Sequence, residues 1–156
     1  MPSTITQNSS LSAPGRTGTI YRVAVELIVE KGFGGTSIGD IAKAVGMTKA
    51  GLYHHISGKQ DMLYQIMQHA MDELESQVIV PVRLIADPEE RLHEMMRLHI
   101  QGAIEHGCAF TIVMSEVSHL ESAERKKIVK RKKAYHALAR QALQELAEQG
   151  RLRDLD

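Results

Sequence analysis

The side chains best suited to chemistry lie between residues 49 and 59, where cations, a tyrosine and two histidines occur without a carboxylate. Lys49 and Tyr53 are four residues apart, as are Ala50 and His54, so a helix would place each pair on one face. Such a face offers positive charge and hydrogen-bond donors, which suit the phosphates and base edges of a DNA groove. We therefore predict a DNA-binding surface here. The competing interpretation is an ordinary solvated helix face.

Two short helices are predicted to carry this surface. Ser37 followed by Asp40 forms a capping box that starts the first helix, and apolar residues at helical spacing follow it. Gly46 is placed to end that helix, and Thr48 is suited to cap the next one. A helix, a short turn containing glycine and a second helix together form a helix-turn-helix.

The second helix should turn two apolar side chains inward. Leu52 and Ile56 are four residues apart and are expected to be buried against the preceding helices. A third helix is predicted to begin at Ser57 to Lys59, where free N–H groups and a cation are available to a phosphate. Its apolar period continues until Pro81, which is expected to end it.

The remaining segments also have helical periodicity, and none shows a strand pattern. Helices are predicted from residue 17 or 19 to 31, and over 87–107, 109–117 and 122–150. Residues 1–15 are rich in Ser, Thr, Pro and Gly and are predicted to form a disordered arm. The prediction is an all-α protein with a DNA-binding domain at 16–62 and a helical regulatory domain at 63–156.

Composition sets broad limits on the type of protein. The 156 residues carry a formal net charge of zero, so a DNA-binding surface would have to be local. A single cysteine excludes an internal disulfide and fits the reducing cytoplasm. No apolar run approaches the roughly 20 residues of a membrane span, so we expect a cytoplasmic protein without a membrane partner.

The second half of the chain is rich in methionine, which suits an adaptable apolar ligand pocket. The predicted lining residues are Met67, Met71, Met95, Met96, His99, Phe110 and Met114. Ordinary core packing is the alternative for each of them. An elongated apolar ligand is favoured because the few aromatic residues beyond position 80 do not form a cage for a cation.

Catalytic, cofactor and metal sites are not predicted. Cys108 has no neighbouring nucleophile pattern and is read as a small buried thiol just after a helix end at Gly107. His99 and His106 share a helix face, but a metal site would need further carboxylate or thiol ligands at regular spacing. The predicted helix end at Gly107 interrupts that spacing. The basic run at 125–133 is interpreted as a solvated helix face because acids precede it on the same helix.

The segment from Gly15 to Ile66 resembles the DNA-binding domain of the TetR family of transcriptional regulators. The resemblance rests on Ala24 with Leu27, Lys31-Gly32-Phe33, Thr36-Ser37 with Asp40-Ile41-Ala42, Val45-Gly46-Met47-Thr48-Lys49, Leu52-Tyr53-His54-His55 and Lys59. It implies that Lys49, His55 and Lys59 contact phosphates. The full set of implied DNA-binding residues is Ser37, Thr48, Lys49, Ala50, Gly51, Tyr53, His54, His55 and Lys59.

The same resemblance implies a repressor that binds a palindromic operator in double-stranded DNA as a homodimer and leaves it when a small effector binds. Some members of the family sense acyl-CoA thioesters, which a Met-rich lining would suit. Members usually have two more long helices that form the dimer, so the chain is expected to be a truncated version of a longer regulator. The alternative function is a small-molecule-binding or protein-interaction module without DNA binding, and an enzyme is not expected.

Overall fold

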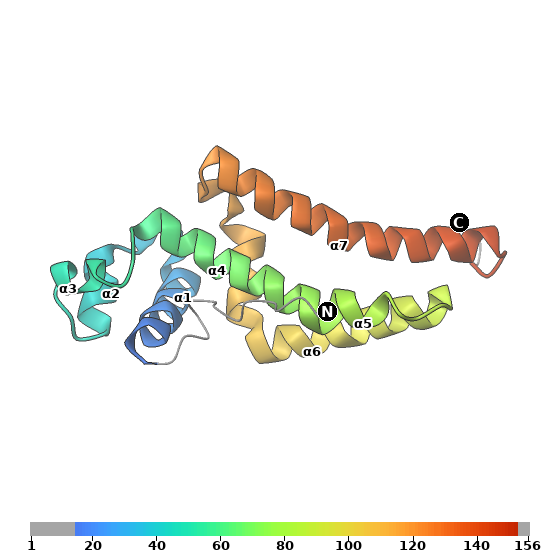
Figure 1. The fold of residues 1–156 in the computed structure, drawn as a ribbon, viewed down its shortest axis with the longest axis horizontal. Helices are drawn as coiled ribbons and strands as arrows, with labels where there is room; N and C mark the ends of the chain where they lie inside the picture. The colour runs from blue at the N-terminus through green and yellow to red at the C-terminus, as the bar shows by residue number, and fades with distance from the viewer. Residues whose placement is uncertain (1–14, 153–156) are drawn as a thin grey trace, which may run out of the picture.

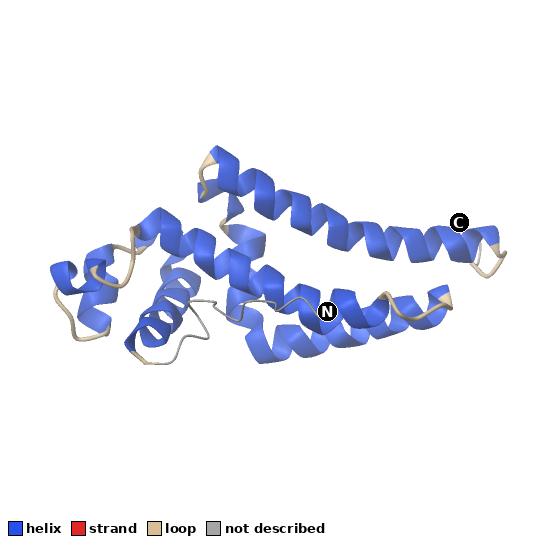
Figure 2. Cartoon of the chain, in the orientation of Figure 1, coloured by secondary structure: helices blue, strands red, loops and turns tan. Residues whose placement is uncertain are grey.

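The computed structural model describes residues 15–152, with the backbone alone at His106, and every regular element in this range is helical (Figure 2). The predicted arm at 1–15 therefore lies, apart from Gly15, outside the described residues. The elements are α1 Arg16–Gly35, α2 Ile38–Ala44, α3 Lys49–Tyr53, α4 Lys59–Leu74, a π-helical turn Glu75–Ile79, α5 Val80–Val82, α6 Pro88–Ser115, a 3-10 turn Val117–His119 and α7 Ser122–Glu148. The all-α prediction is confirmed for this range.

Helix α1 runs past its predicted end at Lys31. Gly32 takes a left-handed conformation (φ 74°) and kinks the helix, after which one more helical turn continues to Gly35. Thr36 stabilises this turn, because its buried hydroxyl lies 2.9 Å from the carbonyl oxygen of Gly32 and 3.1 Å from that of Leu27. Gly34 and Gly35, which follow the predicted helix end, therefore lie in the final turn of α1.

The third helix ends at Val82, one residue after the predicted end at Pro81, and its path runs from α4 through a π-helical turn into α5. A proline in an α-helix lacks an N–H donor, and its ring clashes with the carbonyl four residues earlier. Here the wider π-helical turn at Glu75–Ile79 precedes the proline, and the Val80 N–H donates to the carbonyl of Glu75, five residues back. The wider turn makes room for Pro81 within a continuous helix.

Gly107 likewise does not end α6, which continues to Ser115. The separate helix predicted at 109–117 is the last part of α6. A side chain at Gly107 would meet no atom within 4 Å, so the glycine is not placed there by a steric requirement. α6 bends sharply where its colour passes from yellow to orange, and its last part leads at a steep angle from its first part towards the start of α7 (Figure 1). Cys108 is exposed in this segment, contrary to the prediction of a buried thiol.

Helix α7 lies along the other helices of the second half (Figure 1), and ion pairs tie it to them at two places. Near its start, Arg131 bonds Asp72 (2.7 Å) and Glu75 (3.0 Å), which lie on α4 and the π-helical turn. Towards its end, Glu145 accepts from the guanidinium of Arg91 on α6 (3.0 Å). These two ties set the position of α7 over α4 and α6.

One continuous hydrophobic core extends from α1 to α7. Ile20 of α1, Ile66 of α4 and Ile128 of α7 are all fully buried members of it. Because α4 contributes to both halves of this core, the division into domains at residue 62 stays a prediction. None of the helices in the described range is long and apolar enough to cross a membrane.

Candidate functional site

The buried side chain of Leu52 positions α3 at the end of the molecule farthest from α5 (Figure 1). Leu52 is completely buried, and Ile56 is 5% exposed although it follows the end of α3. Both join the core that contains Ile41 of α2. The predicted burial of these two side chains is confirmed, and it turns the opposite side of α3 to solvent.

Capping interactions set the two helices of the motif. The Asp40 N–H donates to the Ser37 hydroxyl (3.1 Å), and the Ser37 N–H donates to the Asp40 carboxylate (2.8 Å). The hydrogen bonds from the side chain and backbone of Ser37 lower the pKa of Asp40. Gly46, in a left-handed conformation (φ 66°), makes the turn, and the Gly51 N–H donates to the Thr48 hydroxyl (3.0 Å). The predicted capping box and N-cap are confirmed.

The exposed side of α3 consists of Lys49, Ala50, Tyr53 and His54, which we call the binding face. The Tyr53 side chain protrudes, with 54% of its surface exposed. A Cβ built at Gly39 of α2 would lie 2.8 Å from the Cε of Lys49, so the lysine side chain crosses α2 at this glycine. Sequence reasoning missed the role of Gly39, because the contact depends on how α2 and α3 pack.

His55 and Lys59, the two remaining candidates for phosphate contact, have partners inside the protein. The Nδ1 of His55 lies 3.1 Å from the hydroxyl of Thr17, which links the turn after α3 to the first turn of α1. The Nζ of Lys59 lies 4.0 Å from the ring centroid of Phe33. The Phe33 ring also contacts the ring of His119, at 5.4 Å between centroids. Lys59 thus sits at a contact between the first three helices and the segment that joins α6 to α7.

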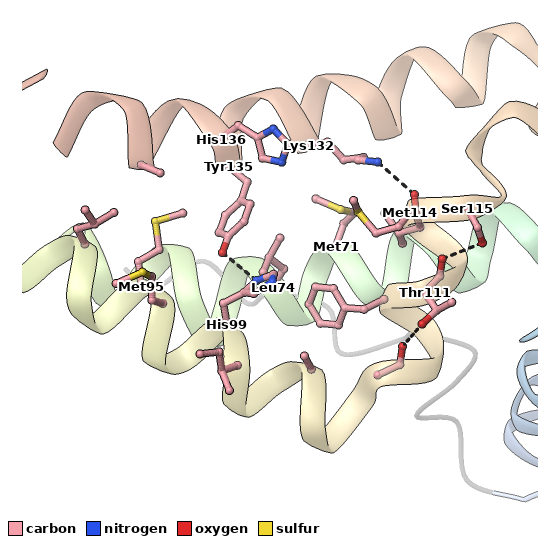
Figure 3. A pocket seen from close by; sticks show the side chains of 18 residues that line it. Met71, Leu74, Met95, His99, Thr111, Met114, Ser115, Lys132, Tyr135 and His136 are labelled. Atoms are coloured by element: carbon pink, nitrogen blue, oxygen red, sulfur yellow. Dashed lines mark hydrogen bonds between the residues drawn. The ribbon is translucent and has the colours of Figure 1, made fainter. Parts of the chain in front are cut away.

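The second candidate site is a cavity of about 900 Å³ between α4, α6 and α7 (Figure 3). Its walls are mostly apolar. They are formed by Met71, Leu74, Leu92, Met95, Met96, His99, Ile100, Ala103, Gly107, Phe110, Thr111, Val113, Met114, Ser115, Lys132, Tyr135, His136 and Ala139. A cavity of this size, with a few polar groups in apolar walls, suits a small organic ligand.

All of the predicted pocket residues line this cavity except Met67. Met67 is completely buried in the core, because α4 turns it away from the cavity. The residues contributed by α7, including Lys132, Tyr135 and His136, were missed. The helical period places Tyr135 on an apolar stripe of α7, but nothing in the sequence indicates that this stripe faces Met71 and His99 across an open space.

A hydrogen-bonded aromatic pair stands out in the cavity wall. The phenol oxygen of Tyr135 lies 2.9 Å from Nδ1 of His99, and the two rings stack with centroids 5.7 Å apart (Figure 3). Phe110 meets the His99 ring edge-on, also at 5.7 Å. Burial raises the pKa of Tyr135, so the phenol keeps its proton over a wide pH range. The pair is therefore a polar feature in an apolar lining.

The basic run on α7 is partly engaged within the protein. Arg131 makes the ion pairs described above, and Lys132 donates to the carbonyl of Val113 (3.3 Å). Lys126 and Lys130 are exposed, as a solvated face requires. Among the described residues, no group of three or more His, Cys, Asp or Glu side chains could hold a metal ion.

The fold and these two sites define a helix-turn-helix protein with a ligand-sized cavity. The family described as "Bacterial regulatory proteins, tetR family" matches residues 20–66, and the "Tetracyclin repressor-like, C-terminal domain" matches residues 86–156. The chain belongs to the TetR family of transcriptional regulators.

Individual relatives agree with this assignment. The transcriptional repressor KstR2 of Mycobacterium tuberculosis is 27% identical over 110 residues, which cover 70% of this chain and 55% of the repressor. The crystal structure of AibR in complex with isovaleryl coenzyme A and operator DNA is 38% identical, with a TM-score of 0.80 over 89% of this chain and 76% of AibR. The TetR family regulator PfmR of Thermus thermophilus is 31% identical, with a TM-score of 0.76 over 88% of this chain and 75% of PfmR. The chain spans about half the length of the KstR2 repressors that it matches.

Proposed function

We propose that this protein is a transcriptional repressor that binds operator DNA through residues 16–62. The observation that carries the proposal is the binding face, which is exposed, rich in donors and free of carboxylates on a helix fixed by the buried Leu52. A short helix held in this way can enter the major groove while its neighbour crosses the phosphate backbone. From this role we infer that the protein acts in the cytoplasm. Binding DNA requires no catalytic residue.

The candidate residues divide into two roles. Lys49, His55 and Lys59 carry the cationic or donor groups that suit phosphates, and Ser37 and Thr48 bring the N-terminal ends of α2 and α3 towards the backbone. Ala50, Gly51, Tyr53 and His54 are better placed for base edges. Phosphate contacts fix the register on the duplex, whereas base contacts supply specificity.

The cavity is proposed to bind an acyl-CoA or a similar apolar effector that releases the protein from its operator. Its methionine-rich walls suit an acyl chain, and Lys132 and His136 supply polar groups at the α7 side. The similarity to AibR, whose structure holds isovaleryl coenzyme A together with operator DNA, supports this class of effector. Two copies of the protein would read a palindrome if their α3 helices were spaced by one turn of DNA.

DNA binding is tested by selecting fragments from a random duplex library and then measuring affinity by fluorescence anisotropy. The Lys49→Ala and Tyr53→Ala variants should weaken binding, and Lys49→Ala should lower the salt slope by about one. Lys126→Ala is the matched control, because Lys126 is an exposed lysine on α7, away from the binding face. Unchanged affinity and salt slope in Lys49→Ala would show that the groove assignment is wrong.

The same assay separates the proposal from its alternative. Isovaleryl coenzyme A added to the protein–DNA complex should lower the anisotropy if the effector assignment is right. A protein that binds acyl-CoA in calorimetry but selects no duplex from the library would instead be a small-molecule-binding module without DNA binding.

A further inference from the structure

We propose that the His99–Tyr135 pair recognises the carbonyl oxygen of the effector's acyl group. The inference rests on the proposed acyl-CoA function and assigns one subsite within the cavity. The pair joins α6 to α7 across the cavity and lines its wall, with Phe110 beside it (Figure 3).

Other hydroxyls in the cavity wall already donate to the backbone of α6. The Thr111 hydroxyl lies 2.8 Å from the carbonyl oxygen of Gly107, and the Ser115 hydroxyl lies 2.9 Å from that of Thr111. A hydroxyl has one proton to donate, so these two groups have none left for a ligand. His99 and Tyr135 differ because they share a hydrogen bond with each other rather than with a carbonyl.

The shared hydrogen bond leaves one donor in either arrangement of protons. If the Tyr135 hydroxyl donates to Nδ1 of His99, the neutral imidazole carries its proton on Nε2. If Nδ1 of His99 donates to the phenol oxygen, the Tyr135 hydroxyl keeps its proton for another acceptor. In both cases the pair keeps one N–H or O–H that can donate to an oxygen of the ligand.

A carbonyl oxygen is the acceptor that this subsite matches. It accepts a hydrogen bond, has no proton of its own to place, and carries no charge to be desolvated. Phe110 and the stacked rings of the pair hold the imidazole plane in place, so the donor direction is preset. Lys132 and His136 lie on α7 near Tyr135 and suit the anionic carrier rather than the acyl oxygen.

The test compares two ligands that differ at one oxygen. Isovaleryl coenzyme A and its thioether analogue, S-(3-methylbutyl) coenzyme A, have the same carbon skeleton, but the thioether lacks the carbonyl. Calorimetry should give about tenfold tighter binding of the thioester to the unaltered chain, because a buried donor loses its acceptor when the thioether binds. The His99→Phe and Tyr135→Phe variants should reduce this preference, and the preference should disappear in the variant that lacks the donating group. His93→Phe is the control, since His93 is exposed and lies outside the cavity lining.

The outcomes are distinguishable. Loss of the thioester preference in His99→Phe or in Tyr135→Phe, with His93→Phe unchanged, supports the proposal. Equal binding of both ligands by the unaltered chain, or an unchanged preference in both variants, overturns it and leaves the effector class standing. Failure of the unaltered chain to bind either ligand overturns both the subsite and the proposed effector. Circular dichroism melting checks that each variant folds. If His99→Phe does not fold, the test rests on Tyr135→Phe, which removes only one oxygen atom.

Discussion

Leu52 determines which side of α3 faces solvent, because it is the completely buried residue of that five-residue helix. A helix this short has little stability of its own, so its position depends mainly on the buried side chain that anchors it. The neighbouring Tyr53 is 54% exposed, so a residue that stabilises the fold stands next to a residue proposed to contact DNA.

Leu52→Ala should lower the free energy of unfolding by about 2–5 kcal/mol, because it leaves a cavity in the core. Urea denaturation followed by circular dichroism measures this change. Tyr53→Ala is the matched control and should stay within about 0.5 kcal/mol of the unaltered chain, since it removes an exposed side chain. Equal losses in the two variants would contradict the orientation of α3.

Glu124 should make stability fall as the pH rises. One of its carboxylate oxygens is buried without a hydrogen-bond partner, and its pKa is raised by burial and by the nearby carboxylates of Glu121 and Asp61. The folded state therefore holds this proton more tightly than the unfolded chain does. The resulting stability is fully present below the unfolded pKa and is lost as the pH rises through the folded pKa.

Glu124→Gln removes this titration. The variant should melt at a higher temperature than the unaltered chain at pH 7, and the difference should shrink towards pH 4, where Glu124 is protonated in both states. Thermal melts between pH 4 and pH 8 measure the effect. Glu30→Gln, an exposed change on α1, should show no such trend. A melting difference that grows towards acid pH would show that Glu124 is stabilised as a carboxylate.

At the scale of elements, local signals predicted helix starts better than helix ends. Ser37, Thr48 and Asp87 start helices as expected, because a cap depends on a few neighbouring residues. Gly107 was wrongly expected to end a helix, since α6 continues through it to Ser115. The helical run that contains Pro81 ends one residue later, at Val82, after a π-helical turn that the sequence pattern did not indicate.

In the candidate sites too, features set by local sequence were predicted, whereas features set by helix packing were not. The apolar spacing around Leu52 indicated the binding face, since one helix period determines which side is buried. Methionine content indicated most of the α6 wall of the cavity. The α7 wall, with Lys132 and Tyr135, depends on how α7 docks across α4 and α6, which helical periodicity does not specify. Met67, which was predicted to line the pocket, is buried in the core and does not line this cavity.

The tie between α6 and α7 at Arg91 gives a prediction for these elements. The Arg91 guanidinium donates to both carboxylate oxygens of Glu145 and to the carbonyls of Ile85 and Ala86. Arg91→Ala should cost about 1–3 kcal/mol, because it removes several charge-assisted hydrogen bonds at a half-buried site. Hydrogen exchange should quicken most in α7 near Glu145. Arg140→Ala, an exposed change on α7, is the control. If the amide exchange rates near Glu145 are the same in both variants, the Arg91–Glu145 ion pair does not hold α7 in place.

At the scale of the whole molecule, the cavity reaches the first three helices through a chain of side-chain contacts. Ser115 lines the cavity, and the adjacent Glu116 accepts from His119 (3.0 Å). His119 contacts the ring of Phe33, which in turn holds the ammonium group of Lys59. A shift at the end of α6 on effector binding would therefore change the position of a proposed phosphate contact.

His119→Ala should weaken the coupling between effector and DNA by about 0.5–2 kcal/mol while leaving effector affinity unchanged. The measurement is the ratio of operator affinities with and without saturating isovaleryl coenzyme A. His93→Ala provides an exposed histidine outside this chain of contacts as a control. An unchanged ratio in His119→Ala would exclude this contact as the route of coupling.

The two ties of α7 have a consequence for effector choice. The residues that α7 contributes to the cavity, from Lys132 to Ala139, all fall between Arg131 and Glu145. With the helix fixed on both sides of the cavity, the separation of its walls cannot widen without breaking an ion pair. If the cavity binds the proposed effector, this arrangement makes it a gauge of ligand thickness, because a bulkier group is admitted only if its binding energy exceeds that of the ion pair it displaces.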